Sequence, residues 1–210
     1  MTYSLNEVEL TAKKAARGAG YPWGMAEEAG KATRWLCQQG LDGCLVLAEL
    51  LKQSDGADLA DWSPKPNSSD WNIKAKPLCP IMTGAAISDH ANGLRIQTIH
   101  VSNVLQPLLL LPFAAMAARQ LDATITLTWS GCVAQTNGHG LHIQGDQMDG
   151  ADFILIKIDG PVESLQTQTS RSSPDADAWA ALGQFAHRTY APATAESRAK
   201  GAGAGITDND

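Results

Sequence analysis

The chain has 210 residues, and its 44% apolar content is enough to bury a sizeable core in one domain. With 16 basic against 22 acidic side chains the net charge is −6, which argues against nucleic acid as a partner. The apolar runs fall short of the roughly 20 residues that a membrane-spanning helix needs, and the first residues lack the order of a secretory signal. We therefore expect a cytoplasmic protein with no nucleic-acid and no membrane partner.

The first residues predict a helix with a defined start. Ser4 can cap the amide of Glu7 while the Glu7 carboxylate reaches back to the Ser4 amide, an arrangement known as a capping box. Apolar residues follow at helical spacing from Leu5 to Ala16, and Gly18 supplies the signal for the end.

A second helix is predicted from near Pro22 to Gly40, with proline in the first turn. Gly24 and Gly30 interrupt it, and each costs up to about 1 kcal/mol relative to alanine, so both need a structural reason. At about 100° per residue two opposite stripes form. The apolar stripe holds Met25, Ala29, Ala32 and Leu36, and the polar stripe holds Glu27, Lys31, Arg34 and Gln38.

A third helix is predicted from Asp42 to about Gln53, and its apolar composition makes it the most buried of the three. Residues 54–77 then lose any period because prolines, serines and an asparagine interrupt them. We interpret this segment as a surface connection pinned by Trp62 and Trp71, in preference to a domain boundary.

From Leu78 onward the pattern predicts short strands. The first two are expected at about Pro80 to Ser88 and Leu94 to Ser102, joined as a hairpin by the turn signal Asn92-Gly93. A helix from Pro112 to Leu121 follows, with its proline in the first turn.

The second part of this region is again strand-like. Residues 124–129 alternate between threonine and apolar residues, and 133–135 with 141–144 form a predicted hairpin. Residues 153–158 are apolar on both faces, which indicates a central strand. A last helix is expected from about Ala176 to Tyr190, ended by Pro192.

This order of elements predicts an α+β fold: an N-terminal three-helix segment packed with a largely antiparallel sheet and one or two further helices. We expect a single domain over 1–210. Its parts are a helical segment (1–53), a loop (54–77), a strand-rich part with one helix (78–160), a loop and helix (161–192) and a glycine-rich tail (193–210).

Cysteine and histidine give no strong signal of chemistry. The cysteines lie singly, which is typical of reduced packing thiols, although a catalytic thiol beside a histidine is an alternative. Histidines near two predicted hairpins, at His90, His100, His139 and His142, are not accompanied by any known zinc pattern. We expect no metal and no cofactor. The four cysteines are Cys37, Cys44, Cys79 and Cys132.

The polar stripe of the second helix is the first candidate site. Glu27 or Glu28 would act as acid or base, and Trp23, Lys31 and Arg34 would hold an anionic substrate. The alternative is a solvated helix face in which Glu27 and Lys31 form an ordinary i, i+4 pair.

The glycine-rich tail is the second candidate site. Successive amides from Gly201 to Gly205 could form an anion-binding nest, although the spacing fits no known nucleotide fingerprint. The alternative is a polar end without a binding role. The tail residues predicted to bind substrate are Ser197, Arg198, Gly203 and Asp208.

Two stretches, Arg17–Lys31 and Ser197–Asp210, resemble an uncharacterised family of bacterial proteins of roughly 200 residues, known only as a domain of unknown function. The resemblance implies a bacterial origin and a stand-alone protein. It brings no activity or ligand, but it implies that the two stretches are more than solvated surface.

Two functions are compatible with these observations. In the first, an enzyme or binding protein takes a small anionic metabolite where the second helix and the tail meet. In the second, a non-catalytic subunit uses the same small and apolar residues to form a homodimer or another partner complex. Only the first predicts an enclosed polar pocket.

Overall fold

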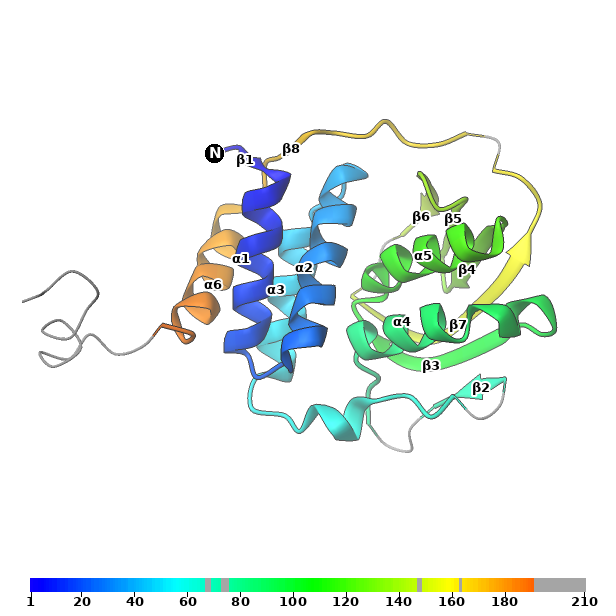
Figure 1. Cartoon of the computed structure of the whole chain (residues 1–210), viewed down its shortest axis with the longest axis horizontal. Helices are drawn as coiled ribbons and strands as arrows, with labels where there is room; N and C mark the ends of the chain where they lie inside the picture. Colours follow the sequence, from blue (N-terminus) through cyan, green and yellow to red (C-terminus); the bar gives the residue numbers. More distant parts are fainter. Residues whose placement is uncertain (67–68, 73–75, 147–148, 163, 191–210) are drawn as a thin grey trace, which may run out of the picture.

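The computed structural model describes residues 1–66, 69–72, 76–146, 149–162 and 164–190, which form two packed halves (Figure 1). One half is a cluster of four helices, and the other is a sheet with two helices on one face. The predicted α+β class is confirmed. The α-helices are α1 (Leu5–Gly18), α2 (Trp23–Gln38), α3 (Gly43–Ser54), α4 (Pro80–Asp89), α5 (Leu111–Leu121) and α6 (Ala176–His187). The strands are β1 (Tyr3–Ser4), β2 (Asp70–Trp71), β3 (Ile99–Leu105), β4 (Thr124–Trp129), β5 (Cys132–Thr136), β6 (Leu141–Gly145), β7 (Gly150–Asp159) and β8 (Arg171–Ser172).

In the helical half, α1 packs against both α2 and α6, so the first helix of the chain lies beside the last (Figure 1). The predicted capping box is present: the Glu7 amide donates to Ser4 Oγ over 3.2 Å, and the Ser4 amide donates to Glu7 Oε2 over 2.7 Å. Strand β1 pairs antiparallel with β8, which joins the start of α1 to the segment that leads into α6.

Close packing of α1 on α2 explains one of the two glycines in α2. A Cβ atom on Gly30 would lie 2.8 Å from the Glu9 carbonyl oxygen and 3.1 Å from Lys13 Cβ, so the two backbones approach there as only glycine allows. A Cβ on Gly24 would meet nothing within 4 Å, and nothing in the structure explains that glycine.

The predicted apolar stripe of α2 is buried, with Met25 partly so. Burial extends around the helix beyond that stripe because α1, α3, α4 and α5 all contact α2. Helix α3 is also largely buried, as predicted, and Asp42 caps it by accepting a hydrogen bond from the Leu45 amide. The buried residues of α2 are Ala26, Ala29, Gly30, Ala32, Thr33, Leu36 and Cys37.

The six-stranded sheet has the order β2-β3-β7-β4-β5-β6. All its pairings are antiparallel except β2 with β3. The central position predicted for residues 153–158 is confirmed, because β7 lies between β3 and β4. The hairpin predicted around residues 137–140 is also confirmed as β5 and β6. Helices α4 and α5 cover one face of this sheet (Figure 1).

The hairpin predicted for Pro80–Ser88 and Leu94–Ser102 is wrong. Residues 80–89 form helix α4, in which Pro80 occupies the first turn and nearly every side is buried. A helix that is apolar all round shows no helical period, so its sequence is easily taken for a strand. Asn92 and Gly93 lie in a 3-10 helix, Ala91–Arg95, and Gly93 does not adopt the positive φ that a tight hairpin turn requires. As a result, three α-helices follow the N-terminal three in the part of the chain that the structure describes, where one or two were predicted.

The described residues of the connection after α3 are mostly exposed or half-buried, as expected for a surface connection. Two elements of its own interrupt it, a 3-10 helix at Leu59–Trp62 and the short strand β2. Trp71 is buried and Trp62 packs against the core, so both tryptophans pin this connection.

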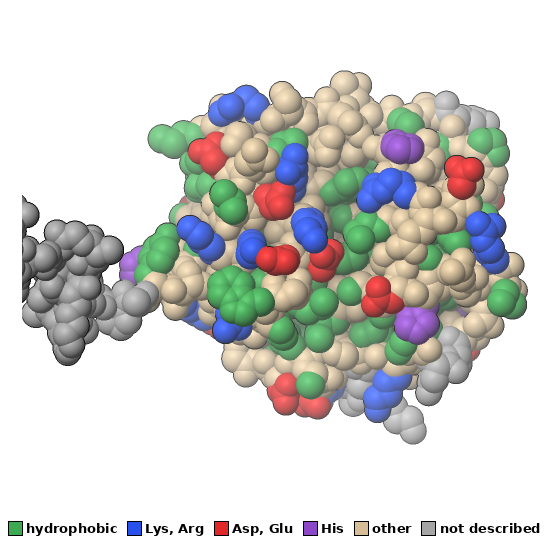
Figure 2. Space-filling view, viewed as in Figure 1, with side chains coloured by type: hydrophobic (Ala, Val, Ile, Leu, Met, Phe, Trp, Pro, Cys, Tyr) green, Lys and Arg blue, Asp and Glu red, His purple; other side chains and the backbone are tan. Residues whose placement is uncertain are grey.

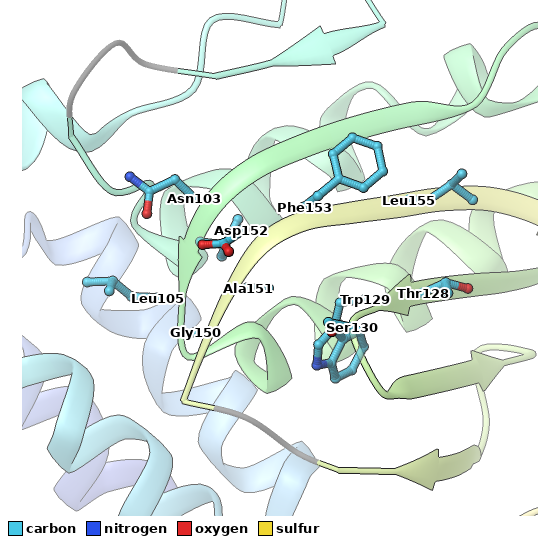
Figure 3. A pocket seen from close by; sticks show the side chains of 11 residues that line it. Asn103, Leu105, Thr128, Trp129, Ser130, Gly150, Ala151, Asp152, Phe153 and Leu155 are labelled. Atoms are coloured by element: carbon cyan, nitrogen blue, oxygen red, sulfur yellow. The ribbon is translucent and has the colours of Figure 1, made fainter.

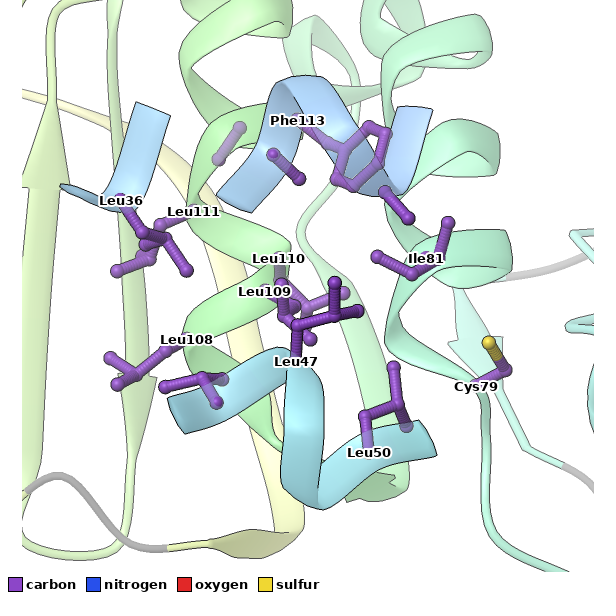
Figure 4. Close-up of a cluster of buried hydrophobic side chains, with 14 of the residues drawn as sticks. Leu36, Leu47, Leu50, Cys79, Ile81, Leu108, Leu109, Leu110, Leu111 and Phe113 are labelled. Carbon is purple, nitrogen blue, oxygen red and sulfur yellow. The ribbon is translucent and has the colours of Figure 1, made fainter. Parts of the chain in front are cut away.

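The two halves share one apolar seam (Figure 4). Leu36 of α2 and Leu47 of α3 face the run Leu108–Leu111, which leads into α5. A Cβ on Gly84 of α4 would lie 2.1 Å from the Phe113 ring, so α4 and α5 are also in very close contact. The three N-terminal helices therefore reach the sheet through α4, α5 and the segment between β3 and α5.

Candidate functional site

A hollow of about 790 Å³ opens on the helical half where α1 ends, α2 begins and α6 ends. Its lining is unusual for this acidic chain, because it includes four basic side chains and two aromatic ones. The lining residues are Leu10, Lys13, Lys14, Arg17, Gly18, Gly20, Trp23, Arg188, Thr189 and Tyr190, and we call this set the basic hollow.

The basic hollow depends on the close approach of α1 and α6. A Cβ atom on Gly18 would lie 1.8 Å from the Phe185 carbonyl oxygen of α6, a distance that no side chain tolerates. Gly20 follows with a φ of 101°, which glycine adopts readily and which turns the chain toward α2. The turn between α1 and α2 thus brings Trp23 to the same rim as the end of α6.

Both aromatic rings lie beside cations. The Trp23 side chain is 60% exposed, with Arg17 5.1 Å and Lys13 5.9 Å from its ring centroid. Lys14 Nζ lies 5.7 Å from the centroid of the exposed Tyr190 ring. Such cation–π contacts hold the rings in place while leaving their outer faces open to a flat ligand.

Two of the four cations are already paired. Lys13 Nζ donates to Glu27 Oε1 over 2.5 Å, and Arg188 donates to both Asp55 oxygens over 2.7 and 2.9 Å. The pKa of each carboxyl group is lowered by its basic partner, so both acids are ionised near neutral pH. Within the described ranges no acid lies at ion-pairing distance from Lys14 or Arg17. Arg17 donates instead to the Tyr21 carbonyl oxygen over 3.0 Å.

The structure places the predicted residues of α2 in pairs along an exposed face. Trp23 lines the basic hollow, and Glu27 contacts it through Lys13. Glu28 accepts a hydrogen bond from Lys31 over 2.7 Å, which raises the pKa of Lys31, and Arg34 bonds Glu9 of α1 over 2.8 Å. In place of the i, i+4 pair of Glu27 with Lys31, Glu27 pairs with Lys13 of α1 and Lys31 pairs with Glu28 of the same helix. Figure 2 shows these acidic and basic side chains together over α1 and α2.

The predicted tail residues Ser197, Arg198, Gly203 and Asp208 lie outside the described residues. The described chain ends at Tyr190, on the rim of the basic hollow. The contact predicted between the second helix and the tail therefore stays a prediction.

The four cysteines are buried free thiols. The Cys37 and Cys44 thiols share a hydrogen bond, which lowers the pKa of Cys37 to about 7 and, together with burial, raises that of Cys44. Cys79 Sγ lies 3.3 Å from the buried Tyr21 hydroxyl. These contacts suit packing thiols, because burial keeps the sulfur atoms away from a substrate.

The histidines are dispersed. His100 Nδ1 lies 3.0 Å from Asp70 Oδ1, and His90 Nδ1 lies 3.0 Å from the Ala86 carbonyl oxygen. In the part of the chain that the structure describes, no three histidine, cysteine or acidic side chains are grouped as metal ligands would be. Over the same residues, none of the helices has the length and apolar character needed to cross a bilayer.

Fold and site together define an α+β protein with a basic, aromatic-lined hollow on its helical half. Residues 3–77 match the model of a family described as a protein of unknown function (DUF3726). The matched residues contain the Arg17–Lys31 stretch, so the resemblance to a family of unknown function is confirmed there. No curated protein matches the chain.

Sequence reasoning missed most of the basic hollow. Lys13 and Arg17 lie four residues apart on α1, with Lys14 beside them, and this basic cluster was the available signal. No sequence signal pointed to Arg188 and Tyr190, because their approach to α1 depends on how α6 packs.

Proposed function

We propose that the chain is a cytoplasmic protein that binds a small anionic molecule with a flat, unsaturated part in the basic hollow. The observation that carries this proposal is a pair of cations, Lys14 and Arg17, that have no acidic partner among the described residues and lie next to the exposed rings of Tyr190 and Trp23. The four free thiols support the proposed compartment.

Charge supports an anion as the ligand. The chain as a whole is acidic, with a net charge of −6, so a hollow whose cations exceed its acids is a local exception. Arg17 offers a planar fork for a carboxylate or phosphate, and Lys14 a compact ammonium. Because Arg17 is already oriented by the Tyr21 carbonyl oxygen, little side-chain entropy is lost when it binds an anion.

Ring stacking supports a flat group on the ligand. The Trp23 indole lies beside Arg17 and Lys13, and most of its surface remains exposed. The volume of about 790 Å³ is in the range of small-molecule sites. Glu27 contributes by fixing Lys13, and the catalytic roles predicted for Glu27 and Glu28 are not needed for binding.

The test is a calorimetric titration of the full chain with phenyl phosphate, which combines a ring with a dianion. We expect the double variant Lys14→Ala/Arg17→Ala to bind about ten-fold more weakly, because two charge-assisted contacts are removed. Trp23→Ala should weaken binding about three-fold through loss of stacking.

The matched control is Lys52→Ala, which removes an exposed lysine of α3 whose ion pair within the described ranges is with Glu49. It should bind phenyl phosphate like the unaltered protein. Equal affinity of the double variant and the control, or no binding to any form, would contradict the proposal. The second outcome would favour the alternative of a non-catalytic subunit that forms a homodimer or another complex.

A further inference from the structure

A second hollow, of about 730 Å³, lies in the sheet half where β4 separates from β7 (Figure 3). The two strands pair as far as Thr128 with Leu155, after which β4 turns back into β5. Strand β7 extends further toward its own start, where β3 is its one partner among the described residues, from Ser102 opposite Phe153 to Leu105 opposite Gly150. The first residues of β7 therefore border open space on one side. We call this space the sheet hollow.

The walls of the sheet hollow are mainly apolar. The Phe153 side chain is 48% exposed, and Leu155, Leu105 and Trp129 are further apolar residues of the lining. Aromatic and branched side chains at the edge of a hollow favour a ligand with an aromatic body.

One polar atom in this wall has no partner. Trp129 is only 3% exposed, and its indole Nε1, a donor, has no acceptor among the described residues. A buried donor that lacks an acceptor is unfavourable, because it has lost its hydrogen bond to water without gaining another. A carbonyl oxygen brought by a ligand would satisfy it.

The opposite side of the sheet hollow carries a negative charge. Asp152 is exposed and, over the described residues, makes no ion pair, and no lining residue is basic. Asp149 directly precedes the lining residue Gly150 and adds a second acid nearby. Figure 3 shows Asp152 next to Asn103 on one side of the hollow, with Trp129 and Ser130 on the other.

We infer that the sheet hollow binds a small cationic aromatic molecule carrying a carbonyl group. The ring packs against Phe153 and Leu155, the ammonium group faces Asp152, and the carbonyl oxygen accepts from Trp129 Nε1. This site is independent of the basic hollow, which lies in the other half and prefers the opposite charge.

The probe for this inference is L-phenylalaninamide, which has a ring, an ammonium group and a carbonyl oxygen. Two relatives each lack one group: 3-phenylpropanamide has no ammonium, and 2-phenylethylamine has no carbonyl. Each is titrated into the full chain at about pH 6, where an α-ammonium is protonated, and followed by NMR. We expect about three-fold weaker binding without the ammonium and about five-fold weaker binding without the carbonyl.

Two variants assign these differences to residues. In Asp152→Asn, L-phenylalaninamide should no longer bind more tightly than 3-phenylpropanamide, so the ammonium advantage is lost. It should still bind more tightly than 2-phenylethylamine, so the carbonyl advantage persists. In Trp129→Phe the carbonyl advantage should vanish while the ammonium advantage persists. In the unaltered protein, addition of L-phenylalaninamide should shift the NMR signal of the Trp129 indole N–H, which is identified by its absence from the variant. Glu49→Gln, an acid on α3, serves as the control and should bind all three probes normally.

Three outcomes would overturn the inference: no binding of L-phenylalaninamide up to about 10 mM, an ammonium advantage that survives in Asp152→Asn, or a carbonyl advantage that survives in Trp129→Phe. The phenyl phosphate titration is unaffected by any of them. If the sheet hollow does not bind L-phenylalaninamide, the proposed function of the basic hollow is unaffected. If the basic hollow does not bind phenyl phosphate, the inference about the sheet hollow is likewise unaffected.

Discussion

The two hollows are similar in volume and opposite in chemistry. The basic hollow is built where three helix ends meet, and it collects lysine and arginine. The sheet hollow is built where one strand leaves another, and among its described lining residues Asp152 alone is charged. Helix ends present long side chains that converge from several directions, whereas a strand presents every second side chain to one face. The basic hollow therefore depends on how helices pack, and the sheet hollow on the pairing register of β4 and β7.

The strongest test of this difference is Gly18→Ala. A Cβ atom there would collide with the Phe185 carbonyl oxygen, so α1 and α6 must separate, and we expect about 3 kcal/mol lower free energy of unfolding in urea. Phenyl phosphate binding should be lost with the shape of the basic hollow, while L-phenylalaninamide binding is kept below the melting transition. Gly24→Ala is the control, since its Cβ meets open space and alanine favours a helix. Equal stability of the two variants would show that α6 does not constrain α1.

A second test concerns the contact that joins the halves, between Tyr21 at the α1–α2 turn and Cys79 before α4. Burial raises the Tyr21 pKa above its ordinary value near 10, so the folded protein holds a proton that the unfolded chain releases above that pH. The resulting stability is complete below about pH 10 and falls by about 1.4 kcal/mol per pH unit above it. Tyr21→Phe should remove this contribution to the slope of unfolding free energy against pH. Tyr190→Phe, at an exposed tyrosine, should keep the full slope, and equal slopes for both variants would refute the argument.

The smallest expected effect is a difference between the two hollows in how strongly salt weakens ligand binding. Raising the ionic strength from about 0.1 to about 1 M shortens the screening length from about 10 to about 3 Å. Phenyl phosphate, a dianion facing Lys14 and Arg17, should bind about three-fold more weakly, and L-phenylalaninamide, facing one carboxylate, should change less. Calorimetry at the two salt concentrations measures both. A larger loss for L-phenylalaninamide would reverse the assignment of charges.

Local signals in the sequence predicted local structure well. The capping box at Ser4 and Glu7, the Asn137–Gly140 hairpin and the central strand at residues 153–158 each depend on neighbouring residues or on a clear period, and all are present. Helix α4 was missed because its surroundings, not its own pattern, make it a helix: both α5 and the N-terminal half bury it.

The candidate sites were harder to predict for the same reason. Trp23 was predicted because it belongs to a distinctive stretch of α2, and it does line the basic hollow. Arg188 and Tyr190 join it only after the chain has completed the sheet and returned to α1. For the sheet hollow, the separation of β4 from β7 depends on a pairing register that no short motif encodes.

The contact between the first helix and the last also has a consequence for synthesis on the ribosome. The 3–77 segment emerges early, but the α6 residues that cover α1 emerge only after the whole sheet has been made. Until then an apolar flank of α1 faces water or a chaperone, because domains are completed only when their last packing partner is available. The amino-terminal half is thus completed only after the residues of the sheet have been synthesised.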